Sequence, residues 1–411
     1  MKSISRLGAY AANTIAVFAV GVLSVPAIIH FAGTAAWAGI AVTQAVAGLG
    51  AVVVAFGWNA MGPSTVATIE PQHRAVYYYR TLVARCALFV VTAPAAVVAS
   101  ILIAGIDPLA ASLSTCAYLA QSLGASWYFV GEGRPGRLLL IDTAPRLLAV
   151  VAGMLALAVG MGLTGFTAFL LAGTVIAGSL GAWTILRGSR LTRGQLRRPH
   201  VGSLLLTQRH AIATTSSAAI YANMPLIAVS VIAPDSREGF ALVFKLYNYA
   251  AAALAPLVQF LQSWVPGAGE ANVGVRSRRA THIAYVGGAC AFAAMLALGV
   301  PAGYVLSAGQ LTPGLSLVLP FAVAIGAVTA SQVVGLACLT ALGRQSVVAA
   351  STAAGAFIGI VLIFVMTSLG GTLGTSWSIA VTEVFVTAYQ CFYVRRAYLK
   401  RLAAQPNEES S

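Results

Sequence analysis

The amino-acid sequence predicts an all-α polytopic membrane protein with about twelve transmembrane helices in two six-helix lobes. Two features of the composition predict this class: 59% of the 411 residues are hydrophobic, and only 8% are charged. Soluble domains carry about 25% charged residues, so most of the usual charge is missing. Apolar stretches of about 20 residues, the length that crosses a bilayer, account for the composition.

The N-terminal apolar stretch follows Lys2 and Arg6 and is too long for a cleavable signal sequence, so it is predicted to be the first membrane helix. The following stretches give the remaining helices in chain order. The twelve predicted helices span residues 9–30, 36–58, 82–104, 109–130, 138–159, 164–186, 211–233, 239–262, 282–306, 315–340, 346–369 and 374–394.

The distribution of basic residues predicts the orientation. The N-terminus, the even-numbered loops and the C-terminus hold 20 of the 24 Lys and Arg residues, whereas the opposite loops hold one, Arg237. Because positive loops stay on the cytoplasmic side during insertion, both termini are predicted to be cytoplasmic. For a bacterial host, this predicts a multi-pass protein of the cytoplasmic (inner) membrane. The net charge of +14 therefore belongs to loops beside a membrane, and we expect no nucleic-acid partner.

Loop lengths indicate two halves of the same topology. The second inner-side connection of each half is long, and the next one is short and ends in Gly plus Arg, as in Gly133-Arg134 and Gly343-Arg344. This pattern predicts two six-helix repeats related by an axis along the membrane normal. The predicted long connections are 59–81 and 263–281. The predicted domains are 1–186, an N-terminal lobe; 187–210, a basic cytoplasmic linker; 211–394, a C-terminal lobe; and 395–411, a cytoplasmic tail.

The sequence contains no recognisable catalytic motif. It has no HExxH, P-loop or GxSxG motif, and its outer loops are short with few acidic residues. The five cysteines lie far apart inside apolar stretches without a CxxC pair, which favours packing roles over metal binding. We therefore expect a transporter that is not an enzyme, with no cofactor and no metal site.

Five ionisable residues fall inside predicted helices, where each costs about 2.5–3.5 kcal/mol at the helix centre and needs a partner or a water-filled cavity. Asp142 and Arg146 are four residues apart on one helix face and can pair. They form either a structural pair or a cavity-facing cation that Asp142 modulates. Arg85 either reaches the membrane interface or lies near the mouth of a cavity.

The other two ionisable residues lie in the second half. Lys245 has no acid within one helical turn and has aromatic and amide neighbours, which favours a substrate-facing role. Glu383 either binds a coupling proton or sodium ion, or hydrogen-bonds a neighbouring helix. Three cations against two acids within the helices favour an anionic substrate.

Four motifs occur in chain order: Phe56-Gly57-Trp58-Asn59 to Val66-Ala67; Trp127-Tyr128-Phe129-Val130-Gly131 with Arg146-Leu147; Phe244-Lys245-Leu246 through Ala255-Pro256 to Gln259-Phe260-Leu261 and Pro266; and Gly370-Gly371 to Gly374 with Thr382-Glu383. They are similar to those of polysaccharide repeat-unit (Wzx-type, O-antigen or oligosaccharide) flippases of the multidrug/oligosaccharidyl-lipid/polysaccharide exporter superfamily. Together they cover both halves, over most of the chain. Ser64 is a departure, because many members carry a basic residue there.

The resemblance implies a MATE-like, V-shaped bundle around a cationic central cavity. It implies alternating-access transport of polyprenyl-pyrophosphate-linked oligosaccharide from the inner to the outer leaflet for surface polysaccharide (exopolysaccharide or O-antigen) biosynthesis. Expected partners are this substrate, membrane lipids, a coupling proton or sodium ion, and a polysaccharide polymerase and glycosyltransferases. The candidate substrate-binding residues are Arg146, Lys245, Arg85, Asn59, Trp127, Tyr128 and Asn248, and the candidate ion-coupling residues are Glu383 and Asp142.

Two other functions stay open on the sequence. A cation-coupled drug or metabolite antiporter of the related multidrug branch would have an acidic cavity. A membrane scaffold for polysaccharide-assembly enzymes would use the basic segment 187–210 as a docking surface.

Overall fold

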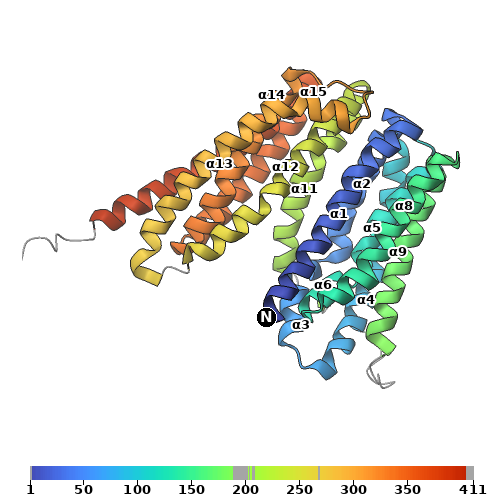
Figure 1. The fold of residues 1–411 in the computed structure, drawn as a ribbon, viewed down its shortest axis with the longest axis horizontal. Coiled ribbons are helices and arrows are strands. Elements are labelled where there is room, and N and C mark those ends of the chain that lie inside the picture. Colours follow the sequence, from blue (N-terminus) through green and yellow to red (C-terminus); the bar gives the residue numbers. More distant parts are fainter. Residues whose placement is uncertain (1, 188–201, 203, 206–208, 267–268, 404–411) are drawn as a thin grey trace, which may run out of the picture. The chain divides into compact units, whose positions relative to one another are not determined.

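In the computed structural model, every described element is a helix (Figure 1). The structure describes residues 2–187, 202, 204–205, 209–266 and 269–403. Ten helical stretches within these residues are long and apolar enough to cross a membrane. One of them, α15 (Gln345–Ala403), consists of two arms, because Gly370 and Gly371 leave helical geometry. With the second arm and the broken stretch at 108–131, all twelve predicted helices correspond to helical segments.

The first compact unit, unit 1, comprises Met1–Asn223 and Leu306–Gln310. Within it, α9 packs against α5 and α8, and α2 packs against α4 and α5 (Figure 1). Thr43 and Ser114, both fully buried, join α2 to α5 through a hydrogen bond of 2.7 Å. Its helices are α1 (Lys2–Ala32), α2 (Thr34–Ala55), α3 (Trp58–Thr68), α4 (Pro71–Ile103), α5 (Pro108–Ala120), η1 (Gln121–Leu123), α6 (Ser126–Gly131), α7 (Pro135–Arg137), η2 (Leu138–Thr143), α8 (Ala144–Ala158) and α9 (Gly162–Arg187).

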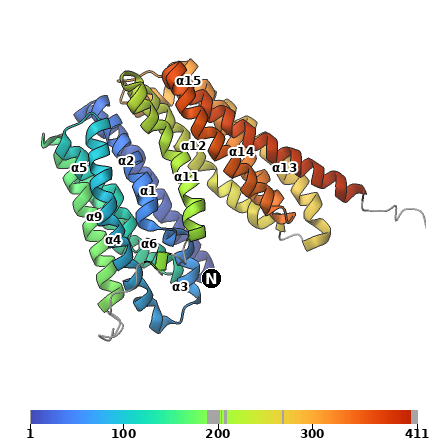
Figure 2. The same cartoon turned by 180° about the vertical axis from the view of Figure 1, so that it is seen from behind.

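The second compact unit, unit 2, comprises Met224–Val305 and Leu311–Ser411, so the boundary falls inside α11 (Arg209–Ile232). Within unit 2, α14 packs against α12 and α15 (Figure 2). The predicted linker 187–210 and the end of the predicted tail lie largely outside the described residues. The further helices are η3 (Pro234–Ser236), α12 (Arg237–Trp264), α13 (Gly269–Leu306), α14 (Leu315–Gln332), η5 (Val333–Leu339) and α15.

The two long predicted connections, 59–81 and 263–281, are wrong as loops. Helix α3 occupies most of the first connection, and α4 begins at Pro71, where a proline suits the first helical turn. In the second connection α13 begins at Gly269. The 33 residues of α4 would extend about 50 Å, well beyond a hydrocarbon core of about 30 Å. Hydropathy identifies segments apolar enough to lie in lipid. The sequence prediction therefore missed the helical turns in these two connections, which have a more polar composition.

The two short Gly-Arg connections have the same backbone geometry. Gly133 and Gly343 adopt positive φ angles of 66° and 71°. The following amide closes the turn in each case: Arg134 N donates to Phe129 O at 3.1 Å, and Arg344 N donates to Leu339 O at 2.8 Å. Only glycine enters the left-handed region without strain, so this residue fixes both turns.

Aromatic packing and a close glycine contact organise unit 2. The ring of Phe321 on α14 contacts the rings of Phe240, Phe244 and Tyr247 on α12, with centroid distances of 5.6–6.1 Å. A Cβ atom added at Gly288 on α13 would lie 2.7 Å from the carbonyl oxygen of Gly326 on α14. The two backbones can approach this closely because neither residue has a side chain.

We predict that Gly288→Ala destabilises unit 2 by about 1–3 kcal/mol, because the methyl group must push α13 away from α14. Thermal unfolding of the detergent-purified protein, followed by tryptophan fluorescence, measures this effect. The matched control is Gly287→Ala, whose Cβ would lie 3.8 Å from Thr329, an ordinary contact. Equal losses in the two variants would contradict the close-packing explanation.

Candidate functional site

A break in the membrane stretch 108–131 lies at the centre of the candidate site in unit 1. Helix α5 ends at Ala120, a 3-10 turn follows, and α6 begins only at Ser126. The amides of Tyr128 and Phe129 both donate to Ala125 O, at 3.0 and 3.1 Å. The carbonyls of the preceding turn are therefore left to other donors, and a buried carbonyl without a donor is costly.

Arg85 on α4 supplies these donors. Its Nη1 donates to Ser122 O at 2.9 Å and to Gly124 O at 3.1 Å. The guanidinium carbon also lies 5.2 Å from the ring centroid of Trp127, within cation–π range. Arg85 is fully buried, so it does not reach out to the membrane interface as the alternative prediction allowed. It holds the broken stretch against α4.

Asp142 and Arg146 form an ion pair on the other side of Gly124. Arg146 Nη2 donates to Asp142 Oδ1 at 2.9 Å, which confirms that the two residues can pair across one helical turn. The Asp142 side chain is 6% exposed and that of Arg146 is 21% exposed. A Cβ atom at Gly124 would lie 2.5 Å from Arg146 Nη2 and 3.1 Å from Asp142 Oδ1. The glycine thus contacts the ion pair directly while its carbonyl binds Arg85.

The cluster of Arg85, Asp142 and Arg146 carries a formal charge of +1 and has unused donors. Arg85 Nη2 and Arg146 Nε are buried without a hydrogen bond of ordinary geometry among the described residues, as are the Tyr78 hydroxyl and Trp127 Nε1. The side chains of Arg85 and Tyr78 do lie within interaction reach of each other. Buried polar groups in proteins are nearly always paired, so these atoms are candidates to bind a further group. All four can donate a hydrogen bond, an arrangement suited to an anion rich in acceptor oxygens.

Unit 2 holds the remaining predicted ionisable residues. Lys245 on α12 places its Nζ 5.5 Å from the ring centroid of Tyr249, within cation–π range. Asn248, on the same helix, is exposed. Glu383 on α15 is 8% exposed and lies within electrostatic reach of Tyr247. Unit 2 therefore has a lysine and a glutamate that are both close to tyrosines of α12.

The structure brings together four of the predicted site residues in unit 1: Arg85, Trp127, Asp142 and Arg146. Tyr128 is buried beside them, with its ring 5.4 Å from that of Tyr78. Asn59 is exposed on α3. The described residues contain no group of three or more His, Cys, Asp and Glu side chains placed to hold a metal ion.

Sequence reasoning missed Tyr78 and Gly124. A signal for Gly124 was present, because Gln121-Ser122-Leu123-Gly124 places two polar residues and a glycine inside an apolar stretch. No comparable signal marks Tyr78, since tyrosines also occur in ordinary membrane-helix packing.

We predict energetic coupling between Asp142 and Arg146 of about 0.5–3 kcal/mol, the range for residues in direct contact. Asp142→Asn and Arg146→Gln should each lower the free energy of unfolding, and the double variant should lose less than the sum. Denaturation in mixed micelles measures all four proteins. The comparison cycle is Glu132→Gln with Arg137→Gln, a longer 3.7 Å pair with a half-exposed arginine, for which we expect about 0–1 kcal/mol. Coupling at Asp142 no greater than at Glu132 would contradict a tight ion pair.

No protein-family model matches the chain, and no curated protein is similar enough in sequence to match it. Solved structures do match in fold. The chain is similar to a lipid II flippase, MurJ, in an inward closed conformation, with a TM-score of 0.64 and 13% identity over 95% of this chain and 89% of that one.

An inward-facing multidrug resistance MATE family transporter of the MOP superfamily matches with a TM-score of 0.61 and 12% identity over 96% of both chains. A Vibrio cholerae MATE transporter matches with a TM-score of 0.52 and 12% identity over 96% and 94% of the two chains. At these identities the likeness shows a shared fold. The chain has the helical fold that MATE and MurJ transporters share.

Proposed function

We propose that the protein is a flippase that moves polyprenyl-pyrophosphate-linked oligosaccharide repeat units from the inner to the outer leaflet by alternating access. The observation that carries this proposal is the cluster at Gly124, where two arginines and one aspartate meet in the interior of an apolar helical unit. A structural ion pair alone would be neutral, and this cluster keeps a net positive charge. Such a charge inside a membrane protein is typical of a site for an anion.

Pyrophosphate fits the donors of this cluster. Arginine binds phosphate oxygens through two parallel N–H groups, and each charge-assisted hydrogen bond contributes about 1.5–3 kcal/mol. Arg146 is the arginine with an exposed fraction, so in the proposal it makes the first contact and Asp142 restrains it. Arg85, which already binds two carbonyls, would contribute its unpaired Nη2.

Lys245 supplies the cation of unit 2 in the proposal. Exposed amides are suited to hydrogen bonds with sugar hydroxyls, and this is the role proposed for Asn59 and Asn248. Trp127 and Tyr128 are buried, so they would stack on a sugar only if α6 moves. The polyprenyl chain would remain in the lipid, and no covalent chemistry is required of the protein.

The fold is consistent with this proposal, since the matched structures include a lipid II flippase. It is equally consistent with a cation-coupled antiporter, because a multidrug resistance transporter matches nearly as well. The buried carboxylates of Glu383 and Asp142 favour this second candidate, since acids are the groups that bind a coupling proton or a cationic drug. The two candidates differ in the charge of the transported molecule.

We predict that proteoliposomes containing the protein move a lipid-pyrophosphate oligosaccharide across the bilayer, as reported by a membrane-impermeant glycosidase. Arg146→Ala and Lys245→Ala should each slow this movement at least about tenfold, the effect of losing one charge-assisted contact. Lys245→Arg should retain most of the rate because it keeps the cation. Arg137→Ala, which removes a half-exposed arginine paired with Glu132, is the matched control and should flip at the wild-type rate.

Export of cationic dyes without movement of any tested lipid-linked glycan would replace the flippase with the antiporter. If both activities were missing from reconstituted protein that melts normally, the transporter class itself would be wrong and the scaffold hypothesis would gain support.

We predict that Glu383→Gln removes the response of transport to an imposed proton or sodium gradient while leaving movement without a gradient largely intact. The amide is similar in shape to the carboxyl group but cannot take up or release the coupling ion. Comparing initial rates with and without each gradient measures this. A gradient response identical to that of the wild type would eliminate Glu383 as the coupling residue, and Asp142→Asn would then be the next variant to test.

A further inference from the structure

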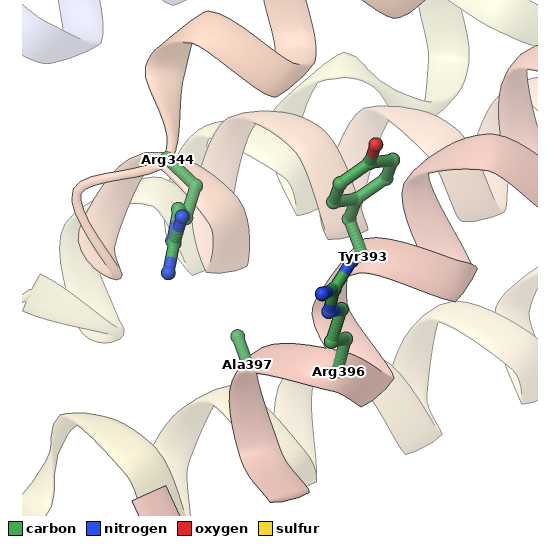
Figure 3. Close-up of a pocket in the computed structure, with 4 residues that line it drawn as sticks. All are labelled: Arg344, Tyr393, Arg396 and Ala397. Carbon is green, nitrogen blue, oxygen red and sulfur yellow. The ribbon is translucent and has the colours of Figure 1, made fainter. Parts of the chain in front are cut away.

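A second basic site lies in unit 2, and none of the residues that line it belongs to the candidate site described above. A pocket of about 200 Å³ is lined by Arg344, Tyr393, Arg396 and Ala397. Figure 3 shows Arg344 on the connection that precedes α15 and the other three residues on the second arm of that helix. Both arginines are exposed, while Tyr393 and Ala397 are half-buried. Two cationic side chains therefore border one small pocket.

The equivalent turn of unit 1 shows what is unusual about Arg344. There, Glu132 directly precedes Gly133 and lies 3.9 Å from Arg134 and 3.7 Å from Arg137. In unit 2 the residue preceding Gly343 is Leu342. No described carboxylate forms an ion pair with Arg344 or Arg396, so the arginines of the unit 1 turn have a carboxylate partner and the arginines of this pocket do not.

Two arginines that share a pocket repel each other, and an anion between them relieves that repulsion. The pocket is smaller than the 300–1,000 Å³ typical of drug-sized ligands, which favours a compact group. Guanidinium groups bind phosphate oxygens through paired N–H donors, and Ala397 leaves room where a larger side chain would fill the pocket. The ring of Phe392 lies 5.4 Å from that of Tyr393, which lines the pocket, and Phe392 is 61% exposed, so apolar surface suited to an acyl chain lies next to Tyr393.

We propose that this pocket binds a phosphate group, presented either by the headgroup of an anionic lipid or by soluble inorganic phosphate. Basic pockets between membrane helices are a common way of holding lipid phosphates. This proposal goes beyond the flippase function and does not rest on it, since none of the four lining residues belongs to the candidate transport site.

The test uses the full-length protein in detergent and native mass spectrometry, with phosphatidic acid and phosphatidylcholine of identical acyl chains as probes. We expect wild-type protein to retain phosphatidic acid at least about tenfold better than phosphatidylcholine. Arg344→Gln and Arg396→Gln should each reduce this retention about tenfold, because each loses a charge-assisted contact. Ala397→Leu should reduce it equally without any change of charge. Arg134→Gln, in the equivalent turn of unit 1, is the matched control and should retain the lipid as the wild type does.

Inorganic phosphate distinguishes the two sources. Displacement of the lipid by millimolar phosphate would identify a soluble anion as a ligand, and persistence of the lipid would identify the headgroup; both results support a phosphate site. Wild-type retention by Arg344→Gln, Arg396→Gln and Ala397→Leu would overturn it. If a glutamine variant fails to fold, the Ala397→Leu variant tests the proposal instead, because leucine is well tolerated in a helix. The melting temperature of this variant shows whether its fold is intact.

Discussion

The constraint on which the candidate site depends is that a backbone carbonyl inside a membrane needs a donor from the protein itself. Helices meet this requirement automatically, and the break between α5 and α6 does not. Arg85 meets it by donating to Ser122 and Gly124 from a different helix. These two hydrogen bonds fix the course of the chain at Gly124. Because Gly124 also contacts Asp142 and Arg146, the same bonds determine where the ion pair lies.

The two arginines of the cluster have different roles. Arg85 holds the backbone in place, and Arg146 has a donor left to bind a further group. Arg85 uses Nη1 on two carbonyls and keeps Nη2 unpaired, whereas Arg146 uses Nη2 on Asp142 and keeps Nε unpaired. Burying a charge is unfavourable unless other groups compensate for it. A single aspartate offsets only one of the two cations, so the cluster would be more stable with an additional anion. This residual charge favours an anion-binding role over a purely architectural one.

The sequence was sufficient for the features that depend on local periodicity. It predicted the twelve helical segments, and the spacing of Asp142 and Arg146 predicted their pairing. It could not predict that Arg85 lies in the protein interior, because hydropathy gives a residue's position along the helix and not the direction in which it points. It also placed loops at 59–81 and 263–281, where most of the described residues are helical but less apolar. Which residues share the Gly124 cluster depends on contacts between distant segments, and sequence spacing does not encode these directly.

The two Gly-Arg turns have the same backbone geometry but different neighbouring side chains. Both turns need a glycine, Gly133 or Gly343, because the backbone there has a positive φ angle. The amide of the next residue closes each turn in the same way. The preceding side chain differs, since it is glutamate in unit 1 and leucine in unit 2. The backbone therefore tolerates either residue, while the arginine that follows the glycine has a carboxylate partner in unit 1 and none among the described residues in unit 2. An arginine without a carboxylate partner keeps its donors for another anion, and this is the reason to look for a phosphate at Arg344 and not at Arg134.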